Sequence, residues 1–327
     1  MKVAILGCEF FARPHYVSWL ARAYQRLGCD VVTVGGNGDQ ASNGYIDPVA
    51  VLPAVQFGQP RIGLHAVQQA TGPVDLAVMV DCGNNFAVMN DGSAPYAYLW
   101  REANANEWGS KAGPAANGAP VFACMTGNGK YNGNDSNVHF MPFAVDREVF
   151  CHNRPYNERE FAFVYTGRER GNGTWGWVSQ TLAGLKAGTS ACTTYIDGYR
   201  EYAELLSKAK CTYTVDSGRY VGSRGLEAMA MGCASYFDGG AAFNHMGFSF
   251  NHDCMQLQIQ TDPGSGEYVP TPQALEDIAA LVKDRERWES ISSNARKSIL
   301  SAHTYEHRAV TIAQACGITL PKTIEEV

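Results

Sequence analysis

The fold is decided by the stretch Ser223-Arg224-Gly225-Leu226-Glu227-Ala228-Met229-Ala230-Met231-Gly232, which continues as Cys233-Ala234-Ser235-Tyr236-Phe237. Its spacing predicts a short amphipathic helix over residues 222–231, ended by Gly232, and a strand over residues 235–237. Arg224 and Glu227 are three residues apart and therefore lie on one face of this helix. A helix N-terminus suits a diphosphate, and a carboxylate one turn further along suits two vicinal ribose hydroxyls. The stretch thus predicts a nucleotide-sugar site; the alternative is a core helix with a surface Arg–Glu pair.

Length and composition indicate an ordinary soluble globular enzyme with two domains. The chain has 327 residues, of which 45% are hydrophobic and 18% charged, and this length exceeds the usual size of one hydrophobic core. No apolar run approaches the roughly 20 residues that a membrane span requires. The apolar run within residues 1–7 is too short for a signal peptide, and we expect these residues to form the first strand.

Ten cysteines are scattered along the chain, without C-x-x-C pairs and without zinc-finger spacing to histidines. Several of them, such as Cys124, Cys211 and Cys233, fall in apolar segments, where a free thiol behaves as a small buried hydrophobe. We therefore expect reduced structural thiols, a cytoplasmic protein and no bound metal.

The charge balance argues against binding that is dominated by electrostatic attraction to nucleic acid or anionic lipid. The formal net charge is −6, and no basic run occurs in the sequence. Residues 1–150 carry 9 Lys and Arg against 12 Asp and Glu, which leaves 17 against 20 for the remainder. Neither half is basic.

Strand-like and helix-like segments alternate along the chain, as in parallel sheets that helices cover on both faces. The expected strands lie at residues 2–6, 31–34, 76–80, 121–125, 161–165, 211–215 and 235–237. The other expected helices lie at residues 16–27, 199–208, 272–283, 285–303 and 305–316. Residues 93–120 lack a regular pattern, and we expect their second part to be a long surface loop. The prediction is an α/β protein with two doubly wound Rossmann-like domains, residues 1–147 and 148–327, that face a cleft.

A glycine-rich loop follows the first expected strand of the second half, with the sequence Thr166-Gly167-Arg168-Glu169-Arg170-Gly171-Asn172-Gly173-Thr174. Such a loop at the carboxyl end of a parallel strand can bring backbone N–H groups and arginines to a phosphate. Arg168 can supply a bidentate contact to a pyrophosphate. The alternative is an exposed turn. The chain has no G-x-x-x-x-G-K-[ST] loop here and no G-x-G-x-x-G after its first strand, which disfavours kinases and Rossmann dehydrogenases.

Five motifs follow one another in an order typical of a known family. They are Met141-Pro142-Phe143-Ala144-Val145-Asp146-Arg147-Glu148-Val149-Phe150, Thr166-Gly167-Arg168, Tyr202-Ala203-Glu204-Leu205-Leu206-Ser207-Lys208-Ala209-Lys210, the stretch 223–232, and His303-Thr304-Tyr305-Glu306-His307-Arg308-Ala309. Together they resemble the GT-B glycosyltransferases over about residues 138–315, and most closely their CgeB-like spore-maturation group. The resemblance implies the GT-B fold, with a C-terminal helix that returns to the first domain. It also implies transfer of a sugar from a nucleotide-sugar donor to an acceptor hydroxyl.

The resemblance places the donor on the second domain and the acceptor on the first. Glu227 takes the position of the glutamate that binds the donor ribose, and Ile196, between Tyr195 and Asp197, borders the nucleobase. The implied donor-binding residues are Gly167, Arg168, Arg170, Ile196, Arg224, Gly225 and Glu227. The expected donor is a UDP-sugar, although no residue near Ile196 distinguishes uridine from guanosine by rule.

One position departs from the family pattern. Related retaining enzymes carry a second glutamate eight residues before the ribose glutamate, and here that position is Arg219. Contacts to the donor sugar and the stereochemical outcome, retaining or inverting, are therefore left open.

The chemistry needs a stabilised leaving group, because charge builds on the diphosphate as its bond to the anomeric carbon breaks. Arg168, Arg224 and helix N–H groups can provide this without a metal, and the sequence has no D-x-D triplet to hold one. An inverting enzyme also needs a general base for the acceptor hydroxyl. The candidates are Asp81, after the strand at 76–80, and His15, in the loop after the first strand. A capping or turn role is the alternative for Asp81, and a partly buried structural role is the alternative for His15.

The acceptor is not defined by the sequence. Tyr96, Tyr98 and Trp100 are either core residues or a surface on which an acceptor stacks. The acceptor classes are a glycan, a protein, a small molecule or, as for some bacteriophage enzymes, a hydroxymethylated base of DNA. Two other functions stay open: a nucleotide-sugar 2-epimerase, which would share Glu227, and a non-catalytic nucleotide-sugar-binding protein.

Overall fold

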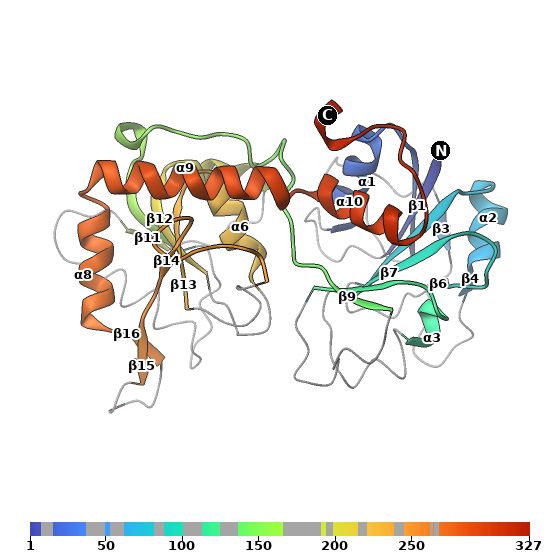
Figure 1. The fold of residues 1–327 in the computed structure, drawn as a ribbon, viewed down its shortest axis with the longest axis horizontal. Coiled ribbons are helices and arrows are strands. Elements are labelled where there is room, and N and C mark those ends of the chain that lie inside the picture. The colour runs from blue at the N-terminus through green and yellow to red at the C-terminus, as the bar shows by residue number, and fades with distance from the viewer. Residues whose placement is uncertain are drawn as a thin grey trace. The chain divides into compact units, whose positions relative to one another are not determined.

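The computed structural model divides the chain into two compact units, which are described separately. Unit 1 is Met1–Pro142 together with Tyr305–Val327, and unit 2 is Phe143–Thr304. The structure describes residues 1–7, 16–36, 50–52, 62–81, 88–100, 113–124, 137–165, 191–193, 199–214, 221–238, 245–261, 264 and 268–327 (Figure 1).

Unit 1 is built on a parallel sheet of seven strands, in the order β3-β2-β1-β5-β7-β8-β9. The strands are β1 (Lys2–Gly7), β2 (Asp30–Gly36), β3 (Ala50–Leu52), β5 (Leu76–Asp81), β7 (Tyr96–Trp100), β8 (Val121–Ala123) and β9 (Val138–Phe140). A small second sheet pairs β4 (Ile62–Gly63) with β6 (Val88–Met89). The helices are α1 (Tyr16–Arg26), α2 (Leu64–Thr71) and α3 (Gly113–Ala116). The strand order runs outward from β1 in both directions, which is the doubly wound arrangement.

The last helix of the chain, α10 (Tyr305–Ala315), belongs to unit 1 and packs on α1. The rings of Trp19 and Tyr305 lie 5.4 Å apart, and the hydroxyl of Tyr24 donates a hydrogen bond of 3.2 Å to the carbonyl of Ala309. Arg26 Nε donates to the fully buried Glu306 carboxylate at 2.5 Å. These contacts hold the C-terminal helix to the first unit, as the sequence predicted.

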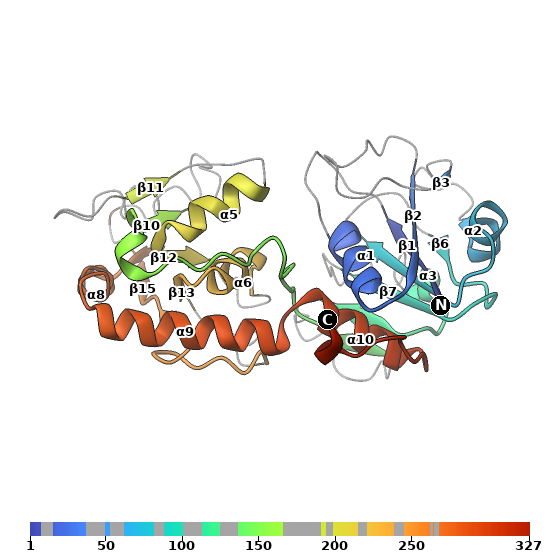
Figure 2. The same ribbon diagram turned by 90° about the horizontal axis from the view of Figure 1, so that it is seen from above.

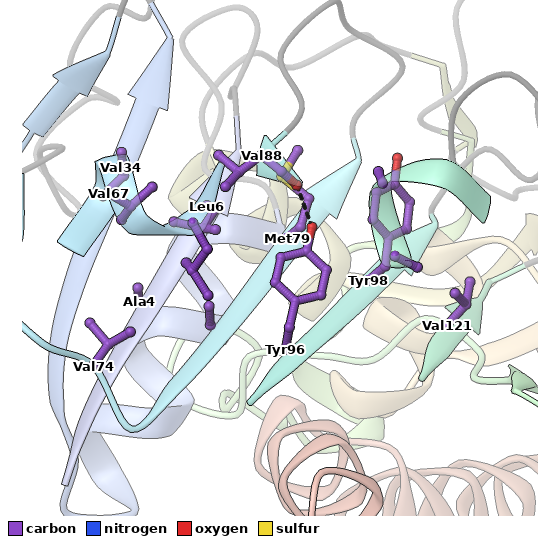
Figure 3. Packing of buried hydrophobic residues seen from close by; sticks show 14 of the residues in the cluster. Ala4, Leu6, Val34, Val67, Val74, Met79, Val88, Tyr96, Tyr98 and Val121 are labelled. Carbon is purple, nitrogen blue, oxygen red and sulfur yellow. Dashed lines mark hydrogen bonds between the residues drawn. The ribbon is translucent and has the colours of Figure 1, made fainter. Parts of the chain in front are cut away.

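The core of unit 1 includes the aromatic side chains of β7. Tyr96, Tyr98 and Trp100 are 3%, 0% and 0% exposed and belong to the same core cluster as aliphatic residues of β1 and β5. Figure 3 shows Tyr96 and Tyr98 among these residues. The Tyr96 hydroxyl donates to the carbonyl of Val88 at 2.6 Å, the interaction drawn as a dashed line in Figure 3. These three residues are therefore core residues, and the alternative of an acceptor-stacking surface is wrong.

Unit 2 is built on a parallel sheet of five strands, in the order β11-β10-β12-β13-β14. The strands are β10 (Phe161–Tyr165), β11 (Ala191–Thr193), β12 (Ala209–Thr214), β13 (Ala234–Phe237) and β14 (Met255–Gln256); an antiparallel pair, β15 (Ile259–Thr261) and β16 (Tyr268–Pro270), follows. The helices are α5 (Tyr199–Ser207), α6 (Ser223–Ala230), α8 (Pro272–Leu281) and α9 (Arg285–Ala302). Short 3-10 turns occur at η2 (Tyr156–Glu158) in unit 2 and η3 (Ile324–Glu326) in unit 1.

Local sequence explains where the helices of unit 2 begin. The Thr271 side chain accepts a hydrogen bond from the backbone N–H of Ala274 and so caps α8, whose first residue is Pro272. Asp284 caps α9 in the same way, through the N–H of Arg287. Apolar residues of both helices pack against Phe163, Tyr165 and other strand residues to form the core of unit 2.

The predicted elements agree with the structure in both units, with one correction. The second part of residues 93–120, predicted as a long surface loop, contains helix α3 at residues 113–116, while residues 101–112 lie outside the described residues. The buried strand β7 at residues 96–100 was not predicted as a strand. The continuous apolar and aromatic run of β7 is what a strand buried on both faces requires. No helix among the described residues is both long and apolar enough to cross a membrane.

Candidate functional site

The candidate site of unit 2 is the carboxyl edge of its sheet, where α6 begins after β12 (Figure 2). Ligands of open parallel sheets bind at this edge. The N-cap residue of α6 is Gly222, with extended backbone angles of φ −61° and ψ 136° and no side-chain cap. The N–H groups of the first turn therefore point toward a place where an anion can be bound.

Glu227 and Arg224 lie on this helix in different environments. Glu227 is 2% exposed, whereas Arg224 is half-buried. Among the described residues, no ion pair or hydrogen bond engages the guanidinium of Arg224. The alternative interpretation of a surface Arg–Glu pair is therefore wrong, because the glutamate is buried and the arginine is not paired with it.

Gly225 allows α6 to approach the sheet closely. A Cβ atom at this position would lie 2.6 Å from Cζ of Phe237 and 3.1 Å from Oγ1 of Thr214. Because real Cβ atoms do not make contacts as short as the first, only glycine fits here without displacement of the ring. Close packing explains this glycine, and its predicted role in donor binding stays a prediction.

Two hydroxyl-bearing residues at this edge were not singled out from the sequence. Tyr165 ends β10 and Thr214 ends β12; they are 3% and 6% exposed. Neither hydroxyl has a hydrogen-bond partner among the described residues. A hydroxyl at the last position of a parallel strand was the signal available, because the carboxyl ends of parallel strands line ligand sites.

Five of the predicted site residues lie outside the described residues. They are His15, Gly167, Arg168, Arg170 and Ile196. The expected phosphate loop and nucleobase border therefore remain predictions from the sequence, as does the role of Arg219.

Asp81 is the last residue of β5 in unit 1 and is 2% exposed. Its Oδ2 accepts a hydrogen bond of 2.8 Å from the hydroxyl of Tyr98, on the neighbouring strand β7. This contact holds the carboxylate in one orientation at the carboxyl edge of the first sheet. A carboxylate held in this way can orient or deprotonate a hydroxyl that reaches it.

The other described side chains with chemical potential are metal-ligating groups and cysteine thiols. In the part of the chain that the structure describes, no group of three or more His, Cys, Asp or Glu side chains is arranged to hold a metal ion. Seven cysteines of the described part of the chain are free thiols: Cys29, Cys124, Cys151, Cys211, Cys233, Cys254 and Cys316. Burial raises the pKa of Cys316 to about 11 and also raises the pKa of Cys211, Cys233 and Cys254, so these thiols are protonated at neutral pH.

Comparisons with known proteins identify the class to which this architecture belongs. Residues 154–314 match the family model described as glycosyl transferase-like. An alpha-glucosyltransferase, solved with UDP-glucose and DNA containing an abasic site, has a TM-score of 0.60 at 11% identity, over 96% of this chain and 99% of that one. HepE of Anabaena, solved with UDP and glucose, has a TM-score of 0.59 at 13% identity, over 97% and 98% of the two chains. Sucrose-phosphate synthase of Thermosynechococcus elongatus has a TM-score of 0.59 at 11% identity, over 96% and 97%. No curated protein sequence matches the chain significantly.

These matches confirm the predicted α/β fold class as that of the GT-B glycosyltransferases. The second half of the chain carries a glycosyl transferase-like domain, which confirms the predicted class of enzyme, a glycosyltransferase. The finer resemblance to the CgeB-like group stays a prediction.

Proposed function

We propose that this glycosyltransferase transfers a sugar from a nucleoside diphosphate sugar, bound on unit 2, to an acceptor hydroxyl. The observation that carries the proposal is the combination of three features on α6. Its N-terminus has no side-chain cap, Arg224 forms no ion pair with a described residue, and Glu227, one turn further along, is buried. This helix lies within residues 154–314, which match the glycosyl transferase-like family.

Each part of α6 suits one part of such a donor. The first-turn N–H groups and Arg224 stabilise the diphosphate, on which negative charge develops as the glycosidic bond to it breaks. Glu227 accepts hydrogen bonds from the two ribose hydroxyls. Gly167, Arg168 and Arg170 are assigned to the diphosphate and Ile196 to the nucleobase, on the family resemblance alone.

A UDP-sugar is the donor we favour. Several proteins of similar fold were solved with UDP or UDP-glucose, among them the alpha-glucosyltransferase and HepE. No metal is needed in this scheme, because the cationic and amide groups on α6 face the same charge that a metal would neutralise.

Unit 1 is assigned the acceptor. Asp81 is the proposed general base for the acceptor hydroxyl, and the hydrogen bond from Tyr98 supports this role by orienting the carboxylate. His15 is the second candidate. The bounds predicted from the sequence, residues 1–147 for the acceptor domain and 148–327 for the donor domain, differ from those of units 1 and 2 chiefly in that residues 305–327 belong to unit 1. The proposed site of action is the cytoplasm.

The acceptor class is proposed as a glycan, a protein or a small molecule, with DNA as the alternative. The alpha-glucosyltransferase of similar fold was solved with DNA, which favours testing a hydroxymethylated duplex. The net charge of −6 argues against DNA, because a duplex-binding face normally needs clustered Lys and Arg.

Release of UDP from UDP-glucose by the full chain tests this proposal. We expect slow release alone and faster release with the correct acceptor, tried as free sugars, a glycan, a peptide and a hydroxymethylated DNA duplex. Glu227→Gln should abolish release. Glu204→Gln should not, because Glu204 is half-exposed and pairs with Arg154 on the surface of the same unit.

The outcomes separate the competing functions. Binding of UDP without turnover under any condition would identify a non-catalytic nucleotide-sugar-binding protein. Conversion of the donor to an epimeric sugar without need of an acceptor would identify the 2-epimerase alternative.

A further inference from the structure

The carbonyl groups at the C-terminal end of α6 are satisfied in two different ways. Gly232, at φ +72°, completes a Schellman motif, in which two backbone N–H groups donate to the carbonyls of Ala228 and Met229 at 2.9 and 3.0 Å. The motif leaves the carbonyls of Ala230 and Met231, and each of these accepts a hydrogen bond from an arginine side chain. The end of the helix is therefore closed by side chains as well as by backbone.

Two guanidinium groups from separate segments of the chain bind this end of α6. Nη1 of Arg296, on α9, donates to the carbonyl of Ala230, and its Nη2 donates to the carbonyl of Cys151 at 2.9 Å. Nη2 of Arg159 donates to the carbonyl of Met231 at 2.8 Å. Because α9 packs on α6 (Figure 2), Arg296 joins the two helices directly.

The charges of these arginines are balanced by the helix itself. No carboxylate among the described residues forms an ion pair with Arg159 or Arg296. Burial of a charge without an opposite charge nearby is unfavourable. The C-terminal carbonyls of a helix carry the equivalent of roughly half a negative charge, which compensates the two cations here. The first turn of α6 has neither an acidic residue nor a side-chain cap, so its positive pole is left for an anion.

The groups assigned to the donor lie close to the end that is held. Glu227 precedes Ala230, whose carbonyl Arg296 binds, by three residues, and Arg224 precedes it by six. The helix has 8 residues and is therefore about 12 Å long. A helix this short is not stable by itself, so tertiary contacts fix its position. A contact that fixes the C-terminal end consequently also fixes where the first turn and Glu227 lie.

We propose that Arg296 is a positioning residue of the donor site, which acts through α6 on the first turn and on Glu227. Its hydrogen bonds hold the C-terminal end of the helix, and its charge opposes the negative pole there. This inference rests on the proposed function and adds a residue outside the contacts assigned to the donor. Arg159 also binds the carbonyl of Ala209 on β12, so Arg296 is the more selective residue to test.

Calorimetric titration of the full chain with UDP tests the proposal. Arg296→Met should weaken UDP binding by about threefold to tenfold, as expected when a cation is lost from the C-terminus of a helix that binds an anion at its N-terminus. Arg296→Lys keeps the charge and a donor, and its affinity should stay within about twofold of the wild type. Arg296→Gln keeps a donor without the charge and should lie between these two variants. If Arg296→Met does not fold, the comparison of Arg296→Gln with Arg296→Lys carries the test.

Two variants of the same unit control for a general loss of stability. Tyr156→Phe removes a hydroxyl that donates to the carbonyl of Val282, and Arg287→Met removes a cation of α9 that pairs with Asp277. Neither of these contacts involves α6. Tyr156→Phe should lower the unfolding midpoint in urea, and both variants should bind UDP as the wild type does.

A double-mutant cycle with Arg224→Met tests whether Arg296 acts through the helix. If Arg296 positions the first turn, part of its effect disappears when the arginine of that turn is absent. The loss of UDP affinity in the double variant should therefore be smaller than the product of the two single losses.

The outcomes distinguish failure of this inference from failure of the proposed function. UDP affinity that is lost in Glu227→Gln but unchanged in Arg296→Met would overturn the positioning role alone. An Arg296→Lys variant that binds UDP as weakly as Arg296→Met, or single losses that simply multiply in the cycle, would overturn it as well. A wild-type chain that binds no nucleotide would overturn both.

Discussion

The tyrosine hydroxyls of β7 in unit 1 donate hydrogen bonds, whereas the hydroxyl of Tyr165, at the end of β10 in unit 2, has no partner among the described residues. Tyr98 donates to Asp81, and the N-terminus of α2 is capped from a distance by Asp91, whose Oδ2 accepts from the backbone N–H of His65 at 2.8 Å. In unit 2, the Tyr165 hydroxyl has no partner among the described residues and α6 has no side-chain cap. A helix N-terminus is thus capped by a carboxylate in unit 1, whereas that of α6 in unit 2 has no side-chain cap. We place the donor at the uncapped helix.

Two arginines of unit 2 show the same contrast. Arg159 is 5% exposed and donates to the carbonyls of Arg154, Ala209 and Met231. Arg224 is half-buried and donates to none of the described residues. The first is a structural residue that ties three backbone segments together, and the second is available to a ligand.

Arg159→Met should have the largest effect on stability. The substitution leaves several buried carbonyls without donors and removes a guanidinium that lies 4.8 Å from the ring centroid of Trp288. We expect a loss of about 3 kcal/mol or more in the free energy of unfolding, measured by urea denaturation. Arg287→Met, which breaks the surface pair with Asp277, should cost about 1 kcal/mol or less. Equal costs would contradict the structural role of Arg159.

Arg224→Met should weaken UDP binding without lowering stability, in contrast to Arg159→Met. We expect UDP affinity to fall by about tenfold or more, because a charge-assisted hydrogen bond to phosphate is lost. The unfolding midpoint should stay close to that of the wild type, since the arginine has no described partner to lose. Calorimetry and urea denaturation of the same preparation give both values, and a variant that is destabilised but binds UDP normally would place Arg224 among the structural residues.

Gly225→Ala tests how closely α6 packs on the sheet. The new methyl group would lie 2.6 Å from Cζ of Phe237, and such overpacking typically costs about 1–3 kcal/mol. Combining it with Phe237→Leu should cost less than the sum of the two single changes, because the smaller side chain makes room for the methyl group. Strict additivity in urea denaturation would show that the two residues do not compete for this space.

Asp91→Asn should have the smallest effect and should depend on pH. Burial raises the pKa of Asp91, but hydrogen bonds from His65 and Ser93 outweigh it and hold the pKa well below the usual value. The carboxylate therefore adds stability above its unfolded pKa of about 4 and loses that contribution as pH falls below it. We expect the variant to lose about 1 kcal/mol at pH 7 and less at pH 3. A loss that is equal at both pH values would contradict an ionic cap.

Most of the fold was predictable because its signals are local. The apolar runs at residues 76–80 and 161–165 define β5 and β10, and capping residues with Pro272 define the start of α8. The strand β7 was missed as a regular element, because its run Tyr-Ala-Tyr-Leu-Trp is also compatible with an exposed aromatic cluster. Only the neighbouring strands β5 and β8, distant in sequence, determine that these rings are buried.

The candidate site was predictable in part for the same reason. Helical spacing alone brings Arg224 and Glu227 to one helix, and the structure adds that the glutamate is buried and the arginine is not. The hydroxyls of Tyr165 and Thr214 could not be predicted, because the absence of a hydrogen-bond partner is a property of tertiary packing. A sequence contains no direct signal for it.

The central claim is that α6 forms the nucleotide site, and the melting temperature of the full chain tests it most directly. Wild type and Glu227→Gln would be compared with saturating UDP, GDP, ADP, CMP and dTDP. A ligand at 100 times its Kd adds about 2.7 kcal/mol of apparent stability, which raises the melting temperature by several degrees. We predict that UDP raises the melting temperature of the wild type and leaves that of Glu227→Gln unchanged. An equal rise in both proteins, or no rise with any nucleotide, would contradict the claim.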